Sequence, residues 1–189
     1  KRLASVGRAC VLNKVAIMAD DGALLPRGQP GEIVVRGRLV NPGYYKDPEA
    51  TAQVRHFGWH HTGDIGVMDE DGYITIIDRK KDMIISGGFN VYPNEIEQVL
   101  AAHPAIQECA VIGVPDNKWG EAVKAIVSLR PGCTATAAEL IALVRKRLGA
   151  VKSPKSIDFI TDMPRSPAGK VLKTELRKPY WKKQSRAVN

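Results

Sequence analysis

The sequence predicts an α+β protein in two parts, a small β-rich subdomain followed by a compact α/β domain. Over residues 1–78 the apolar runs are short and bounded by glycine, proline or aspartate, which is the pattern of hairpins in a small sheet. After residue 82 the apolar spacing alternates between helix and strand periods. This favours a central, roughly three-stranded sheet flanked by helices over residues 83–189. The boundary therefore falls at residues 79–82.

The β-rich part should hold short strands separated by acidic turns. Asp20-Asp21-Gly22 and residues 69–72 are turn sequences, and the second lies between two apolar runs that should form a hairpin. One short helix is expected after Asp47, because proline occupies its first position. The expected strands are residues 11–18, 32–36, 65–68 and 73–77.

The second part should alternate helices and strands. The amphipathic helix over residues 136–148 has basic residues near its end and is expected to stop at Gly149. The other expected helices are residues 93–100 and the basic segment 173–183. The expected strands are residues 106–114, 122–129 and 156–160.

The composition is that of a globular protein, because 189 residues, 44% of them apolar, are enough for one ordinary core or two small ones. No apolar run approaches the roughly 20 residues that span a bilayer, and no secretory segment follows the basic start. We therefore predict a cytoplasmic protein without a transmembrane segment. Three distant cysteines and four histidines without ligand spacing predict no disulfide framework and no metal site.

Charge is distributed unevenly along the chain. Residues 1–78 carry 9 basic and 10 acidic side chains, whereas residues 79–189 carry 19 and 10. The positive field attracts a polyanion such as nucleic acid, a lipid surface or a phosphorylated small molecule, although a solvated basic surface has the same composition. A nucleic-acid-binding module is disfavoured, because the expected sheet lacks interleaved aromatic residues for base stacking.

A carboxylate and a guanidinium mark the two ends of the expected hairpin. Asp64 and Arg79 should lie side by side if the segment between them folds back on itself. An acceptor carboxylate and a forked donor can then hold the two hydroxyls of one ribose. A hairpin closed by a structural ion pair would have the same spacing.

Two later loops also carry chemistry. In Ser86-Gly87-Gly88, the adjacent glycines permit positive φ and let a ligand approach the backbone, as they also would in an ordinary tight turn. Residues 164–170 form a turn-rich loop that ends in Lys170, but the leading glycine of a P-loop is absent and Val171 replaces the magnesium-binding Ser or Thr. This loop could deliver a single ammonium group to a site formed elsewhere.

Six collinear motifs extend over essentially the whole chain: residues 31–37, 43–45, 58–64, 78–90, 119–120 and 164–170. Together they resemble the adenylate-forming superfamily, which comprises acyl- and aryl-CoA synthetases, peptide-synthetase adenylation domains and firefly luciferase. The run Asp-Arg-Lys-Lys-Asp-Met-Ile-Ile from Asp78 is most similar to bacterial fatty-acid-type CoA ligases. The resemblance implies an acid–thiol ligase. A carboxylic acid, expected to be a fatty acid, would react with ATP to give acyl-AMP and pyrophosphate. CoA would then displace AMP.

The resemblance also implies roles for individual residues. Asp64 and Arg79 would bind the ribose of ATP or AMP, Lys170 would be the catalytic lysine of adenylation, and Lys81 would be the hinge between residues 1–78 and the mobile domain 83–189. Rotation about this hinge would exchange the lysine loop for the glycine loop. The residues that would then meet the pantetheine arm of CoA are Ser86, Gly87, Gly88 and Trp119, with the basic stretch 145–155 near the CoA phosphates.

The same resemblance implies that much of the active site lies outside this sequence. The family's phosphate loop, adenine pocket, acyl pocket and Mg²⁺ ligands all precede the position of Lys1. ATP, CoA and Mg²⁺ would be the cofactors of the whole enzyme, and the fragment alone is expected to be inactive.

Pro164 and the following Gly169-Lys170 are similar to the recognition pattern for bacterial lysine acylation of these ligases. A lysine acetyltransferase acting on Lys170 is therefore a possible partner, because acetylation removes the charge of the lysine. A peptide-synthetase adenylation domain and a luciferase-like enzyme are the alternatives within the superfamily.

Overall fold

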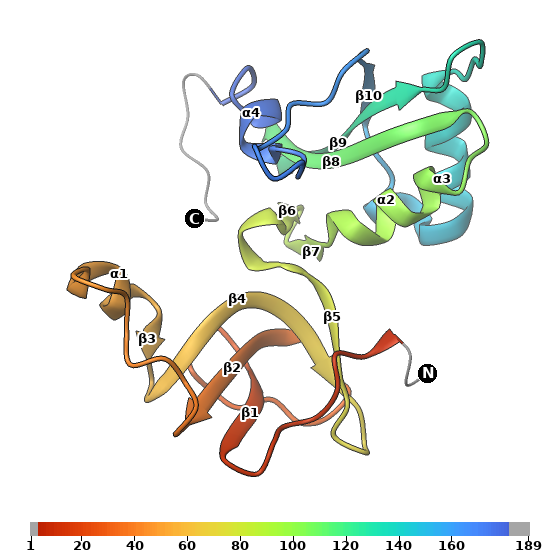
Figure 1. The fold of residues 1–189 in the computed structure, drawn as a ribbon. Coiled ribbons are helices and arrows are strands. Elements are labelled where there is room, and N and C mark those ends of the chain that lie inside the picture. Colours follow the sequence, from red (N-terminus) through yellow and green to blue (C-terminus); the bar gives the residue numbers. More distant parts are fainter. Residues whose placement is uncertain (1–3, 182–189) are drawn as a thin grey trace. The chain divides into compact units, whose positions relative to one another are not determined.

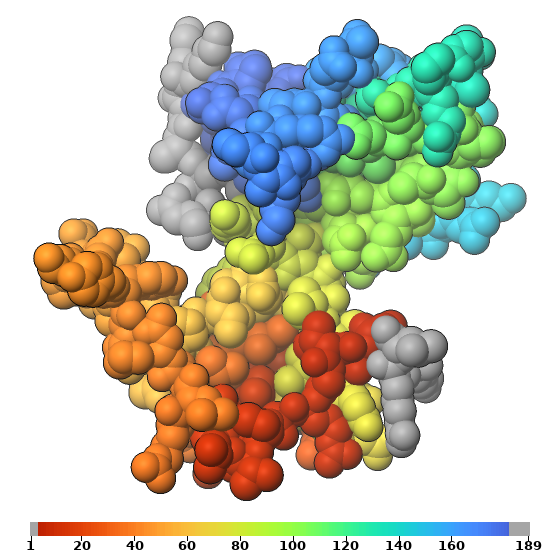
Figure 2. All heavy atoms as spheres, in the orientation of Figure 1, coloured from red at the N-terminus to blue at the C-terminus, as the bar shows by residue number. Residues whose placement is uncertain are grey.

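The computed structural model describes residues 4–181 and divides the chain into two compact units, residues 1–80 and 81–189 (Figures 1 and 2). Each unit has its own five-stranded sheet, and the described strands outnumber the described helices in both units. The predicted α+β class is confirmed. No helix among the described residues is long and apolar enough to cross a bilayer.

The first unit is an antiparallel sheet. Its strand order is β1-β2-β4-β3, and β5 also pairs with β4. The four predicted strands are all present, but β4 begins six residues before the predicted start. The added residues are mostly polar and show no apolar alternation, yet they pair with β2 and β3. The strands are β1 (Asn13–Met18), β2 (Gly31–Gly37), β3 (Arg55–His56), β4 (Trp59–Met68) and β5 (Ile74–Arg79).

Alternation along the strands gives this sheet two small apolar clusters. One contains Ile17, Ile33 and Ile74, and the other contains Met18, Val34 and Trp59. The predicted short helix is α1 (Pro48–Gln53), and the Asp47 side chain caps it by accepting a hydrogen bond from the Ala50 amide at 2.9 Å.

The sheet of the second unit is mixed. β8 and β9 form a long antiparallel pair, β10 runs parallel to β9, and β6 pairs with the start of β9. The three predicted strands are present, and the short hairpin β6–β7 extends the sheet to five. The strands are β6 (Ile84–Ser86), β7 (Phe89–Val91), β8 (Ile106–Asp116), β9 (Gly120–Leu129) and β10 (Ser156–Phe159).

The β6–β7 hairpin contains the tight turn that was one of the two interpretations of the adjacent glycines. Gly87 and Gly88 form its two-residue turn with φ values of 59° and 81°. Two positive φ values are what a tight hairpin turn requires, because they match the right-handed twist of the strands. Strands of three residues are too short to show alternation, so the two strands that flank the turn were not predicted as a hairpin.

Helices cover both faces of this sheet (Figure 1). On one face, α2 (Pro93–Ala101) and α3 (Ala137–Lys152) pack on the main core, which includes Ile96, Val111 and Leu140. On the other face, α4 (Lys173–Arg177) contributes Leu176 to a smaller cluster with Ile112. Alternate residues of β8 thus enter different cores.

The range of α3 joins two helical stretches across Gly149, which has the non-helical angles φ 84° and ψ 177°. The first stretch therefore stops at Gly149 as predicted, and a short second stretch continues to Lys152. The last helix is shorter than predicted, ending at Arg177, and the predicted positions Lys182 and Lys183 lie outside the described residues.

Candidate functional site

The β4–β5 hairpin brings Asp64 and Arg79 together as predicted. They are directly opposite each other in the register, and Arg79 Nε lies 2.9 Å from Asp64 Oδ1. The Arg79 side chain is 58% exposed and that of Asp64 is 25% exposed. A surface ion pair of this kind adds little stability. Its remaining donors and acceptors are available to a ligand with adjacent hydroxyl groups.

A buried carboxylate lies behind this pair. Glu32, in β2, is only 6% exposed. Its Oε2 lies 2.9 Å from His61 Nδ1 and 2.9 Å from Lys80 Nζ, and its Oε1 accepts a hydrogen bond from the Gly63 amide at 3.2 Å. Glu32 therefore holds the neighbours of Asp64 and Arg79 in place. The sequence interpretation missed this role, because residue 32 read only as part of a strand.

The charge of Glu32 should make the first unit sensitive to acid. Burial alone raises the pKa of Glu32, but hydrogen bonds from His61 and Lys80 outweigh it and hold the pKa below its usual 4.5. Folding lowers the pKa of this carboxyl group. Such a group stabilises the fold at pH values above its pKa in the unfolded chain, and this contribution is lost as the pH falls through its pKa in the folded protein. Thermal unfolding should therefore show a decline below about pH 4.5 that Glu32→Gln weakens. An identical pH profile in the variant would contradict this.

The four residues predicted to contact CoA gather around the β6–β7 turn. The Gly87 amide donates a hydrogen bond to the Trp119 carbonyl at 2.8 Å, and buried Ser86 pairs with Gly120. A Cβ at Gly87 would lie 2.6 Å from Trp119 Cε3, so the ring packs directly on the glycine backbone. Gly88 is exposed.

Two lysines flank the Trp119 ring. Lys118 Nζ lies 4.9 Å from the ring centroid and Lys155 Nζ lies 5.7 Å from it. Trp119 is 39% exposed, which makes this surface both aromatic and cationic. Lys118 was not predicted, because its place beside the ring depends on the β8–β9 turn. That turn is fixed by Asp116, whose Oδ1 accepts from the amides of Lys118 and Trp119 at 2.9 Å each.

Lys170 lies on a small hairpin loop that follows β10. Arg165 and Val171 pair across its base, and the Ser166 amide donates to the Lys170 carbonyl at 2.8 Å. Arg165 also donates to the Gly169 carbonyl at 2.6 Å and forms an ion pair with Glu108 of β8. The loop therefore has an internal scaffold, and its blue segment reaches the surface in Figure 2.

The Lys170 side chain itself is exposed. Within residues 4–181 no ion pair holds its amine, although the charged neighbours Arg165 and Lys173 are both paired. A charge on a scaffolded loop without a partner of its own is suited to an external anion.

Lys81 is the exposed central residue of the 3-10 turn Lys80–Asp82. The division between the two compact units falls between Lys80 and Lys81, inside the segment 79–82 that was predicted as the hinge. The hinge role itself stays a prediction.

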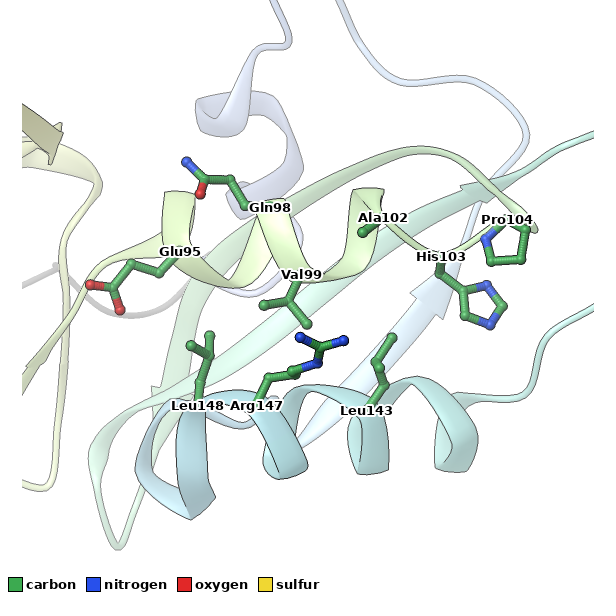
Figure 3. Close-up of a pocket in the computed structure, with 9 residues that line it drawn as sticks. All are labelled: Glu95, Gln98, Val99, Ala102, His103, Pro104, Leu143, Arg147 and Leu148. Atoms are coloured by element: carbon green, nitrogen blue, oxygen red, sulfur yellow. The ribbon is translucent and has the colours of Figure 1, made fainter. Parts of the chain in front are cut away.

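A separate groove of about 540 Å³ lies between α2 and α3 (Figure 3). Val99, Leu143 and Leu148 line it with Arg147 and His103. Of the residues predicted to meet a ligand, it contains only Arg147 and Leu148, from the basic stretch 145–155. Among residues 4–181, no three His, Cys, Asp or Glu side chains cluster in a way that fits a metal ion.

Comparison with known proteins identifies the family. Residues 95–170 match the model of the AMP-binding enzyme C-terminal domain. The whole chain is 43% identical to the medium/long-chain-fatty-acid–CoA ligase FadD8 of Mycobacterium tuberculosis, of which it covers 34%. The chain belongs to the adenylate-forming superfamily. It is also 46% identical, over 92% of its length, to a long-chain-fatty-acid–CoA ligase of Escherichia coli O157:H7, covering 31% of that protein.

Solved structures of the superfamily share the fold. ATP-bound MatB from Rhodopseudomonas palustris is 41% identical with a TM-score of 0.85, over 94% of this chain and 36% of MatB. The o-succinylbenzoate CoA synthetase MenE of Bacillus subtilis, in complex with the acyl-adenylate OSB-AMP, is 34% identical with a TM-score of 0.84 over 100% of this chain and 37% of MenE. This member of the superfamily thus spans about a third of the length of the curated relatives it matches.

Proposed function

We propose that this chain is part of an AMP-forming acyl-CoA synthetase, which converts a carboxylic acid and ATP to acyl-AMP and pyrophosphate and then transfers the acyl group to CoA. The observation that carries the proposal is the exposed amine of Lys170. It lies in a chain that is 43% identical, over its whole length, to part of a fatty-acid–CoA ligase. A medium or long fatty acid is the proposed substrate class. By the family resemblance, the residues that hold the ATP phosphates, the acyl chain and Mg²⁺ would lie outside this chain, so we assign no step to the metal.

In the first half-reaction, two anions must meet. The substrate carboxylate approaches the α-phosphate of ATP, and negative charge develops around phosphorus. We assign Lys170 to this charge, because a positioned cation stabilises a transition state more than it does the separated reactants. Asp64 and Arg79 would hold the ribose and thereby orient the phosphate.

In the second half-reaction, the thiol of CoA must reach the acyl-AMP. The Gly87-Gly88 turn offers a backbone surface without side chains, which a narrow pantetheine arm can approach closely. Ser86 and Trp119 support this turn. The cationic face formed by Lys118 and Lys155 beside Trp119 would attract the phosphates of CoA.

Both half-reactions would use residues of the second unit, which requires that unit to rotate. Residues 1–78 would be the end of the AMP-binding domain, residues 79–82 the hinge with Lys81 at its centre, and residues 83–189 the mobile domain.

The test of the proposal is carboxylate-dependent exchange of pyrophosphate into ATP by the full-length enzyme across a panel of acids. We expect exchange with medium or long fatty acids, followed by thioester formation when CoA is added. The 189-residue chain alone should catalyse neither step. Exchange with no acid in a panel that spans aliphatic, aromatic and amino acids would contradict the proposal.

Asp64→Ala should weaken the binding of ATP. A hydrogen bond to a charged group is worth about 1.5–3 kcal/mol, so KM for ATP should rise about 10- to 100-fold. The contact exists in both ground and transition states, so kcat should change less than KM. Steady-state kinetics with varied ATP measure this, with Asp47→Ala in the same unit as the control. A fall in kcat at unchanged KM would contradict the ribose assignment.

We also propose that acetylation of Lys170 by a lysine acetyltransferase switches off adenylation. The modification removes the positive charge but leaves the loop scaffold of Arg165 in place. Site-specifically acetylated enzyme should lose pyrophosphate exchange and keep the conversion of added acyl-AMP to thioester. Normal exchange by the acetylated enzyme would refute this.

A further inference from the structure

An ion pair lies on either side of Lys81, and each belongs to a different unit. The pair in the first unit is partly buried, with Lys80 34% and Glu32 7% exposed, and the pair in the second unit is largely buried. On the first side, Lys80 Nζ lies 2.9 Å from Glu32 Oε2 and 2.8 Å from Asp20 Oδ1. Glu32 is also fixed by His61 and by the Gly63 amide. All of these groups belong to residues 1–80, so the last residue of the first unit is tied to the sheet of its own unit.

On the second side, Asp82 is tied to the second unit. Its Oδ1 lies 2.8 Å from Nη2 of Arg177, and the two side chains are 16% and 9% exposed. Arg177 is in α4, which packs on β8 through Leu176. Asp82 is therefore fixed to α4, which covers the face of the sheet opposite to α2 and α3.

Each pair has one buried charged member, Glu32 or Arg177. Removing the partner of a buried charge leaves that charge uncompensated in a poorly solvated place, which costs more than losing a surface pair. Burial alone lowers the pKa of Lys80, but the hydrogen bonds that Lys80 donates to Asp20 and Glu32 outweigh it and raise the pKa, so the charge is kept. The side chain of Lys81 is exposed.

We propose that Glu32 and Arg177 are positioning residues that anchor the chain on the two sides of Lys81 and so confine rotation between the units to that residue. This inference rests on the proposed function, because it concerns the rotation that the two half-reactions require. A hinge restricted to a few backbone bonds gives few relative orientations of the units. A hinge that includes Lys80 or Asp82 as well would give many.

Arg177 has a second effect on the site. α4 begins at Lys173, three residues after Lys170, and the Leu172 amide donates to the Pro164 carbonyl at 2.8 Å. The Lys170 loop, α4 and Asp82 are thus joined by short covalent and ionic connections. Arg177 would therefore set where Lys170 arrives when the second unit turns, without touching the substrate itself.

The chain contains its own probe positions for a distance measurement. Cys10 in the first unit and Cys133 in the second are exposed. Burial raises the pKa of the third thiol, Cys109, to about 12, so this thiol should react slowly with a label. Spin labels on Cys10 and Cys133 report the spread of distances between the two units.

We expect Arg177→Met and Glu32→Gln each to broaden this distance distribution beyond that of the unsubstituted chain. Lys178→Gln is the matched control, because Lys178 adjoins Arg177 but its pair with Glu175 is 69% and 42% exposed. Arg177→Lys, which keeps the charge, should recover most of the narrow distribution. If Arg177→Met unfolds the second unit, Asp82→Asn carries the same test. An unchanged width in the folded variants would overturn the inference.

Kinetics of the full-length enzyme separate positioning from ligand binding. Arg177→Met should lower kcat of both half-reactions by about 10- to 100-fold, because small misplacements of reacting groups have effects of that size, with KM for ATP nearly unchanged. Lys178→Gln should change neither parameter. If Lys170→Ala still abolishes adenylation while Arg177→Met leaves kcat unchanged, the anchor fails and the proposed function stands. If Lys170→Ala leaves adenylation intact, the proposed function fails.

Discussion

Lys170→Ala in the full-length enzyme should reduce formation of acyl-AMP by about 10²- to 10³-fold, which is the usual cost of removing one preorganised group that stabilises transition-state charge. Conversion of added acyl-AMP to thioester should stay near the unsubstituted rate, because Lys170 would be away from the site in that step. Pyrophosphate exchange measures the first half-reaction, and single-turnover thioester formation from synthetic acyl-AMP measures the second.

The structure provides the control for this experiment. Lys178 is an exposed lysine of the same unit whose amine is paired with Glu175, so Lys178→Ala should leave both half-reactions unchanged. Lys170→Arg should recover part of the activity, since it keeps the charge but replaces a compact ammonium with a wider fork. Equal losses in both half-reactions for Lys170→Ala would show that this lysine does not leave the site between them.

Gly87→Val should have the opposite effect, a loss of thioester formation with adenylation retained. Gly87 has a φ of 59°, which is a strained conformation for a β-branched residue, and its Cβ would lie 2.6 Å from the Trp119 ring. The ring and the turn must both move, so the surface proposed for the pantetheine arm is lost. We expect at least a tenfold decrease, roughly the effect of a misplaced contact surface.

Gly132→Val is the matched control for the glycine variant. Gly132 also has a positive φ, 74°, but a Cβ there has open space around it. It therefore reproduces the backbone strain without the clash against Trp119. Thermal unfolding should show a loss of stability in both variants from the backbone strain, and a larger loss for Gly87→Val because of the clash with Trp119. A Gly87→Val enzyme that loses adenylation as strongly as thioester formation would contradict the separation of the two surfaces.

The pairing of Asp64 with Arg79 was predictable because its signal is local. An acidic turn over residues 69–72 lies between two apolar runs, and that pattern fixes a hairpin whose ends, Asp64 and Arg79, must meet. The Asp47 cap and the main strands were predictable for the same reason. Each depends on residues only a few positions apart.

The Glu32 cluster was not predictable, because its partners are distant in sequence. His61 is 29 residues away and Lys80 is 48 residues away, and each reaches Glu32 only through the pairing of β2 with β4 and of β4 with β5. The pair of Asp82 with Arg177 spans 95 residues. Contacts of this kind follow from the tertiary fold and leave no periodic pattern in the chain.

The central claim is that one amine enters the site for adenylation and leaves before CoA reacts. A distance between Cys10 and a label at Ala168→Cys, on the Lys170 loop, tests this directly in the full-length enzyme with Cys133→Ser. With ATP and an unreactive acid analogue, the account predicts a short distance. With an acyl-AMP analogue and CoA, it predicts a longer one. The same distance in both states would contradict the account.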